Sequence, residues 1–293
     1  MGQEQKVAVS ALNVRILDPD KRDYEALFRS LLRQRNAIRV YSSDYIILTS
    51  FRKSHTDRIG FIGNIGRFTD IPEDAEWLDT ESLKEAGAED KESIYIPANL
   101  KPNYESFYCG LFEKEHIFAF ETFSDSESLS PRHVLKWLKE AVKSKKSIEK
   151  FGAIEVDIIP DYGVLEKIIT SETLRRIDIT IRKPNPDEFT AAQFAKAEKR
   201  LAELDAKEER IGYTAEDDEY LDLDDERKAL AKVGAENGKV EARLREDGVI
   251  KPVSTADKPI EEQEMYDPED ASASAQFVSL ALRLIAHVKR NRG

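Results

Sequence analysis

The sequence predicts an α+β protein in which largely antiparallel sheets pack against helices. Three observations favour this fold class. Segments rich in β-branched and aromatic residues follow one another at short spacing in the first half of the chain, which is typical of hairpins. Amphipathic segments with the 3.6-residue period of helices interrupt them. Strands and helices do not alternate regularly, as they would in a parallel α/β fold.

The first two expected elements are a strand and a helix. Residues 7–17 alternate in polarity and are rich in β-branched side chains, so we predict a strand. Apolar residues recur at helical spacing over 21–35, which predicts a helix. Asp18 or Asp20 is the expected N-cap of that helix.

A glycine-rich hairpin follows. We predict strands at 45–52 and 58–68, and Gly60, Gly63 and Gly66 recur every third residue in the second strand. No Lys-Ser/Thr pair follows these glycines and no helix begins there, so they do not form a phosphate-binding loop. Glycine within a strand more often marks a bulge or a close backbone approach.

An acidic connection leads to two further strands and the best-defined helix. Residues 70–92 contain ten Asp and Glu and two Lys, which indicates a solvated segment with one short helix. Strands are expected at 104–112 and 115–123. Ser130 is followed by proline, an N-cap with proline at the first helical position, and this predicts a helix over 131–147.

The second half adds strands, an acidic helical hairpin and a terminal helix. Its expected elements are strands at 153–159, 174–182 and 238–245, and helices at 161–170, 188–209, 216–232 and 272–290. Two prolines within 183–187 exclude regular structure there. We therefore expect two α+β domains, 1–125 and 126–293, with the acidic helical hairpin 188–232 inserted in the second.

Composition limits the class of protein. The 293 residues carry a formal net charge of −12, with 40% hydrophobic and 35% charged residues. The chain is too charged for a membrane-embedded protein and too apolar for wholesale disorder. No segment approaches the ~20 consecutive apolar residues of a membrane-spanning helix, and no signal peptide is recognisable. The single cysteine, Cys109, fits a reducing, cytoplasmic compartment.

No recognised catalytic motif is present. Walker A and nucleophile-elbow patterns are absent, and the four histidines lack metal-binding spacing. We therefore expect a non-enzymatic protein with no cofactor, no metal and no catalytic residue. One alternative stays open: Glu155 and Asp157 alternate on the strand 153–159 and point to one face, as acidic residues do in metal-dependent nucleases.

Positive charge is organised along one helix and one strand. Four lysines recur at three- and four-residue spacing on the helix 131–147, and further basic residues follow the strand 174–182. The candidate nucleic-acid-binding residues are Lys136, Lys139, Lys143, Lys146, Arg175, Arg176, Arg182 and Lys183. A basic stripe on an acidic protein favours non-specific contact with phosphates.

Short phrases spread over nearly the whole chain resemble a bacterial defence-associated family. They are SALNVRI, IGFIGNIGRFTDI, IPANLKPNYESF, FAFET and RRIDITIRKPNPDEF. A more distant similarity, over IDITIRKP at 177–184 and REDGVI at 245–250, is to the RexA-type phage exclusion sensors, which have a similar order of elements. This resemblance implies a DNA-binding homodimer that senses phage nucleic acid or a phage complex and acts with a separate effector.

Three functional hypotheses follow. The leading one is a non-enzymatic antiphage defence protein that binds nucleic acid, DNA without sequence preference, as a dimer and acts with an effector protein encoded nearby. The second is an interaction subunit of a toxin or effector complex, without nucleic-acid binding, that docks through 188–232 and the terminal helix. The third is a metal-dependent nuclease that uses Glu155 and Asp157.

Overall fold

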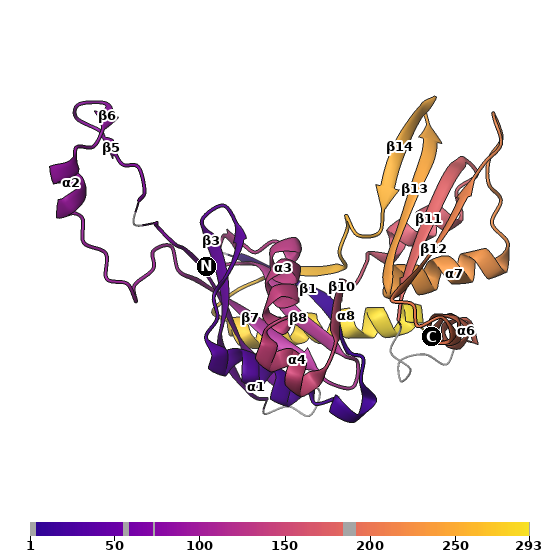
Figure 1. Cartoon of the computed structure of the whole chain (residues 1–293), viewed down its shortest axis with the longest axis horizontal. Helices are drawn as coiled ribbons and strands as arrows, with labels where there is room; N and C mark the ends of the chain where they lie inside the picture. Colours follow the sequence, from indigo (N-terminus) through magenta and orange to yellow (C-terminus); the bar gives the residue numbers. More distant parts are fainter. Residues whose placement is uncertain (1–3, 55–58, 73, 184–191, 293) are drawn as a thin grey trace.

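The strands of the computed structural model, which describes residues 4–54, 59–72, 74–183 and 192–292, form two large antiparallel sheets and one small ribbon (Figure 1). The nine strands of the first sheet are β1 (Gln5–Ile16), β2 (Ile38–Tyr41), β3 (Asp44–Lys53), β4 (Phe61–Thr69), β7 (Glu105–Phe112), β8 (Ile117–Ser124), β9 (Glu127–Ser128), β10 (Ile154–Ile158) and β15 (Glu261–Tyr266). The second sheet contains β11 (Leu174–Arg182), β12 (Glu208–Thr214), β13 (Gly238–Glu246) and β14 (Val249–Ser254). The ribbon pairs β5 (Leu78–Asp79) with β6 (Lys84–Glu85).

Eight α-helices complete the described part of the chain. They are α1 (Tyr24–Gln34), α2 (Ala88–Ser93), α3 (Pro131–Val142), α4 (Lys145–Phe151), α5 (Tyr162–Ile169), α6 (Ala192–Glu203), α7 (Asp225–Glu236) and α8 (Ala273–Arg292). The first sheet follows the order β10-β1-β8-β7-β4-β3-β2, with β15 also beside β1, and the second follows β12-β11-β13-β14. Antiparallel sheets with packed helices confirm the predicted α+β class.

The first sheet is covered on both faces, and its strand β1 contributes side chains to the core on each face. Leu12 and Val14 point toward α1 and α3, where Phe28 stacks on Phe118 with ring centroids 4.8 Å apart. Alternate residues such as Val9 face α8 on the other side. Because successive side chains of a strand point to opposite faces, a strand buried on both faces is apolar almost throughout. This explains the near-continuous apolar run of β1.

The second sheet is covered on one face only. Ile177, Ile179 and Ile181 of β11 are buried against α5 and α7 together with residues of β13. The opposite face carries polar residues, among them Arg176 and Arg182. An antiparallel sheet tolerates one solvated face. Arg176 and Arg182, two of the basic residues predicted on β11, therefore lie on the side away from its core.

The predicted boundary at residue 125 falls within a hairpin of the first sheet. β8 ends at residue 124 and pairs with β9, which begins at residue 127. Two strands from later in the chain, β10 and β15, also pair with β1. Residues on both sides of the predicted boundary thus belong to the first sheet, while the second sheet is made only of later residues.

Two predicted single helices have different bounds in the structure. The helix expected over 131–147 is two helices, because the Ser144 hydroxyl accepts a hydrogen bond from the Ser147 N–H and caps α4 after α3 has ended. The helix expected over 21–35 begins later, since Asp23 caps α1 and Asp18 caps a preceding 3₁₀ turn.

The predicted helical hairpin 188–232 is a helix–strand–helix segment. It contains α6 and α7, but β12 lies between them and pairs with β11. Ile211 and Tyr213 alternate along β12 and pack against the second core, which a strand with a two-residue period permits. Residues 188–191 of this prediction lie outside the described residues. The terminal helix is present as α8, and its apolar stripe is buried against the first sheet.

The glycine pattern of β4 marks the close approach predicted for it. A Cβ placed on Gly63 would lie 2.0 Å from the Ser50 carbonyl oxygen, far closer than atoms pack. The pairing of β3 with β4 shifts register between Leu48 and Ser50, which is the signature of a bulge.

Among the described helices, none is long and apolar enough to cross a membrane.

Candidate nucleic-acid interface

The first two predicted lysines lie on one face of α3 but have different surroundings. Lys136 is exposed, and its Nζ donates a hydrogen bond to the Val40 carbonyl oxygen at 2.9 Å. Lys139 points toward the second sheet, and its Nζ lies 3.8 Å from a carboxylate oxygen of Asp157. Burial lowers the pKa of the Lys139 amine, an effect that Asp157 opposes and Arg182 strengthens. Lys139 is therefore directed at an internal partner.

The other two predicted lysines lie where α3 gives way to α4. Lys143 ends α3 and pairs with Glu140 at 2.7 Å. Lys146 lies in the first turn of α4 and is exposed, with no carboxylate within 4.0 Å in the described part of the chain. These two residues belong to a different surface from Lys139.

The two arginines at the start of β11 have different partners. Arg175 donates a hydrogen bond to the Glu219 carbonyl oxygen and lies over the Tyr220 ring, 5.8 Å from its centroid. Arg176 pairs with Asp178 through two hydrogen bonds, at 2.7 and 3.0 Å. Both guanidinium groups are thus engaged by nearby residues of the same chain.

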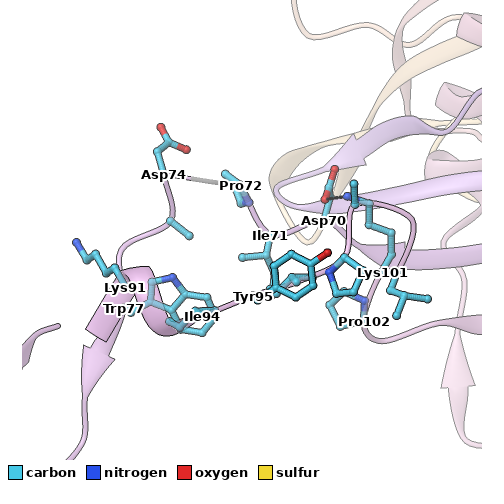
Figure 2. Close-up of a pocket in the computed structure, with 15 residues that line it drawn as sticks. Asp70, Ile71, Pro72, Asp74, Trp77, Lys91, Ile94, Tyr95, Lys101 and Pro102 are labelled. Carbon is cyan, nitrogen blue, oxygen red and sulfur yellow. Dashed lines mark hydrogen bonds and ion pairs between the residues drawn. The ribbon is translucent and has the colours of Figure 1, made fainter. Parts of the chain in front are cut away.

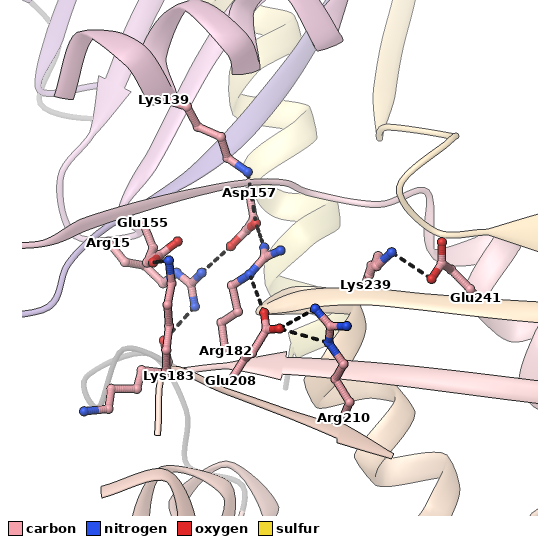
Figure 3. Close-up of polar contacts among 11 residues, drawn as sticks. Arg15, Lys139, Glu155, Asp157, Arg182, Lys183, Glu208, Arg210, Lys239 and Glu241 are labelled. Carbon is pink, nitrogen blue, oxygen red and sulfur yellow. Dashed lines mark hydrogen bonds and ion pairs between the residues drawn. The ribbon is translucent and has the colours of Figure 1, made fainter. Parts of the chain in front are cut away.

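The arginine at the end of β11 lies at the junction of the two sheets (Figure 3). Six residues along a strand separate it from Arg176, which corresponds to about 20 Å. Arg182 donates a hydrogen bond to Asp157 on β10, and its Nε lies 3.8 Å from Glu208 on β12. Lys183 follows directly, and its carbonyl oxygen accepts a hydrogen bond from Arg15 at 2.8 Å.

Asp157 is the centre of this junction network, which we define as Arg15, Lys139, Asp157, Arg182 and Glu208. Asp157 is 3% exposed and Arg15 is fully buried. The guanidinium of Arg15 donates to one carboxylate oxygen of Asp157, and that of Arg182 donates to the other. Figure 3 shows the three side chains converging from the first and second sheets.

The junction network holds the two sheets together. Arg15 and Asp157 come from the first sheet, and Arg182 comes from the second. Arg15 also donates to the Asn237 side-chain oxygen, at 2.9 Å, just after α7. Removing one member of a buried ion pair leaves the other charge uncompensated and costs about 3–5 kcal/mol. These charges therefore have a structural role that their sequence pattern did not reveal.

The geometry gives the nuclease hypothesis little support. Both oxygens of Asp157 accept hydrogen bonds from arginines, and these two positive charges oppose the approach of a metal ion. Glu155 faces Lys207, with 3.7 Å between the charged atoms. Within the described residues, no group of three or more His, Cys, Asp or Glu is arranged to hold a metal.

The pocket beside the junction network and the single cysteine also give no sign of a catalytic site. A pocket of about 110 Å³ lies beside the junction network, lined by Lys139, Arg182 and Lys239 among others. That volume is below the ~300 Å³ of ordinary ligand pockets. Cys109 is buried, and burial raises the pKa of its thiol, so it is an inert core residue.

A second group of cations, which the sequence analysis identified only in part, surrounds the contact between α1 and α4. The Gln34 amide lies 3.5 Å from the Ser147 hydroxyl. Arginines flank Gln34 on both sides, and lysines precede and follow Ser147 along the chain. We call this group the cationic cluster; its members are Arg33, Arg35, Lys143, Lys145, Lys146 and Lys150.

The cationic cluster is exposed and strongly positive. Segments 33–36 and 143–151 contain six Lys and Arg and one Glu, and all six cations are exposed. Lys143 pairs with Glu140, and Lys145 lies 3.9 Å from Glu149. For the other four, no carboxylate of the described residues lies within 4.0 Å. The lysines were visible in the sequence, but only the fold adds the arginines of α1.

Comparison with known proteins places the chain in a family but names no activity. Residues 5–282 match a protein family described as a domain of unknown function, DUF4747. No curated protein matches the chain.

Proposed function

The chain belongs to the DUF4747 family, and from this premise we propose that it is a non-enzymatic sensor that binds nucleic acid through the cationic cluster. The proposal includes a cytoplasmic homodimer that acts in antiphage defence with a separate effector protein. The defence role, the dimer and the effector rest on the resemblance to RexA-type sensors. The nucleic-acid contact rests on the charges of the molecule.

The observation that carries the proposal is the contrast between the cluster and the rest of the chain. The protein has a net charge of −12, yet six cations with one carboxylate among them gather around α4. Exposed lysine and arginine that lack internal partners are available to replace the counterions of a phosphate backbone. Cations held by buried carboxylates, such as Arg182, are not available in this way.

The overall charge determines how such binding would behave. Around 0.1 M salt, charges farther away than about 10 Å are largely screened, so a nucleic acid at the surface interacts mainly with the cluster. At low salt the screening is weaker, and the distant acidic residues repel the nucleic acid as it approaches. The contacts would involve phosphates and not base edges, which gives little sequence preference.

The test is a gel-shift titration of the full chain against double- and single-stranded DNA and RNA, at low and physiological salt. We expect a salt-sensitive shift with intact substrate in parallel lanes that contain Mg²⁺. Reversing three cluster charges, Lys145→Glu, Lys146→Glu and Lys150→Glu, should weaken binding about tenfold or more. It should also reduce the slope of log affinity against log salt by about one for each phosphate that the variant no longer neutralises.

A matched control variant distinguishes the loss of the cluster's charges from a change in the net charge of the protein. The variant Lys199→Glu, Lys232→Glu and Lys258→Glu changes the charge by the same amount on α6, on α7 and in the segment before β15. We expect it to bind nearly as well as the unmodified chain. Equal weakening in both variants, or no shift at low salt, would contradict the proposed surface. Degraded substrate in the Mg²⁺ lanes would instead favour a nuclease.

A further inference from the structure

Between β4 and β7 the chain forms an arm, residues 70–104, that carries β5, β6 and α2 away from both sheets (Figure 1). Ion pairs and hydrogen bonds within the arm hold its segments together. Asp70 pairs with Lys101 at its base, and farther out the Ala86 N–H donates to the Trp77 carbonyl oxygen at 2.8 Å. Lys91 pairs with Glu85 at 2.6 Å. The arm is therefore an ordered projection with very little packing against the body.

The arm exposes large apolar side chains. Tyr95 is 85% exposed, Leu83 77% and Leu78 65%; Ile96, Leu100 and Tyr104 are exposed as well. Single exposed apolar residues are common, but a concentration of them in one projecting segment marks an interaction site. Burial of this surface against a partner would be favourable, because removing apolar area from water stabilises an association.

The arm is also strongly acidic, which selects the kind of partner. It contains ten Asp and Glu and three Lys. A hollow of about 500 Å³ within it is lined by Trp77, Tyr95 and Asp74 (Figure 2). Aromatic faces beside carboxylates recognise lysine and arginine side chains. The same charge repels nucleic acid and anionic lipid, so the occupant is a cationic protein surface.

The cationic cluster on α1 and α4 provides such a surface on the same chain. The segment of α4 that carries three of its lysines also contains Ile148, an apolar side chain that is 50% exposed. The aliphatic stems of the surrounding lysines add further apolar area. In Figure 1 the arm extends away from α1 and α4 of its own body. We propose that the arm of one copy docks on the cationic cluster of a second copy.

The arrangement is reciprocal and closes on itself. Each copy has one arm and one cluster, so a two-fold axis allows each arm to bind the cluster of the other copy, and no site is left open for further growth. The docking does not depend on nucleic-acid binding. If the cluster also binds phosphates, as proposed above, the acidic arm and the nucleic acid compete for it, and the dimer is the form in which the cluster is covered.

Sedimentation velocity of the full chain over a range of concentrations and salt tests the docking. We expect a dimer that dissociates at high salt. Reversing the arm with Glu76→Lys, Glu81→Lys and Glu92→Lys should raise the dissociation constant about tenfold or more, and so should the cluster reversal Lys145→Glu, Lys146→Glu and Lys150→Glu. These side chains are exposed, so folding, checked by circular dichroism, should be unchanged.

Mixing the two variants gives the decisive result. A positive arm then meets a negative cluster at one contact, and a negative arm meets a positive cluster at the other. We expect the mixture to form a heterodimer although each variant alone is monomeric. Tyr95→Ala, which removes an apolar side chain and no charge, should also weaken the dimer. A monomeric parent chain, a dimer unaffected by either reversal, or failure of the mixture to associate would overturn the docking. Gel shifts on the same samples report nucleic-acid binding separately.

Discussion

The junction network and the cationic cluster contain the same kinds of side chain in opposite circumstances. In the junction network, Arg15 and Arg182 share the buried carboxylate of Asp157. In the cationic cluster, cations such as Lys146 and Lys150 are exposed and have no carboxylate within 4.0 Å in the described part of the chain. One group uses its charges inside the molecule, and the other leaves them available to the outside.

The comparison shows that spacing along an element does not determine what a charge does. Lys139 and Lys143 are one helical turn apart on α3, yet Lys139 is directed at Asp157 and Lys143 is part of the cluster. What differs is the element opposite each residue. Asp157 of β10 and Arg182 of β11 lie near Lys139, while Lys143 is exposed and pairs with Glu140 of its own helix. Stability should therefore depend on the first group and binding on the second.

The largest expected effect follows from removing the junction carboxylate. Asp157→Ala leaves two guanidinium groups without their shared partner, one of them fully buried, and should lower the free energy of unfolding by about 3–5 kcal/mol. Urea unfolding followed by circular dichroism measures the change. The control is Glu149→Ala, which removes a carboxylate that lies beside the cationic cluster and is 64% exposed. It should change the free energy of unfolding by no more than about 0.5 kcal/mol. Equal losses of stability in the two variants would contradict the distinction between the junction network and the cationic cluster.

A buried carboxylate without a cation sharpens the comparison. Glu121 on β8 is 1% exposed and accepts a hydrogen bond from the Tyr108 N–H at 2.7 Å. Burial raises its pKa from 4.5 to about 7. Because the folded-state pKa is raised, the stability that the neutral carboxyl confers is fully present below pH 4.5 and is lost as the pH rises through 7.

Glu121→Gln, which stays neutral at every pH, should therefore remove this pH-dependent destabilisation. We expect the variant to be more stable than the parent by about 3 kcal/mol above pH 7, and the gain should disappear toward pH 4.5. Urea unfolding of both proteins across this range measures it. A gain that does not vary with pH would show that the charge of Glu121 is not its cause.

The sequence predicted elements that bury many apolar residues and missed several that bury few. α3 and α8 each bury one apolar stripe, which periodicity located, and β1 is marked by its run of buried apolar residues. β15, with the sequence EEQEMY, is mostly exposed and pairs with β1 through its backbone, so no apolar alternation marks it. The same holds for the exposed edge strand β14. The split between α3 and α4 was missed because one serine cap decides it.

For the candidate site, the sequence supplied the residue types but not their partners. Arg15 and Asn237 are 222 positions apart, and Arg15 and Asp157 are 142 apart. No spacing rule relates them; only the pairing of β1 with β10 and the position of the second sheet bring them together. Lys146 was selected as part of a helical stripe, but the contact of the next residue, Ser147, with Gln34 brings the end of α1 to α4, and no periodicity links these segments.

The smallest expected effect concerns the stability of the cluster, and it is the strictest test of the comparison. Lys146→Ala with Lys150→Ala removes two exposed cations from α4, so the buried ion pairs and the apolar core stay intact. Exposed charges contribute little to folding, and alanine favours the helix slightly. We expect the free energy of unfolding to stay within about 0.5 kcal/mol of the parent, while binding to nucleic acid weakens. A destabilisation comparable to that of Asp157→Ala would mean that these lysines are structural too, and that the cluster is not a free surface.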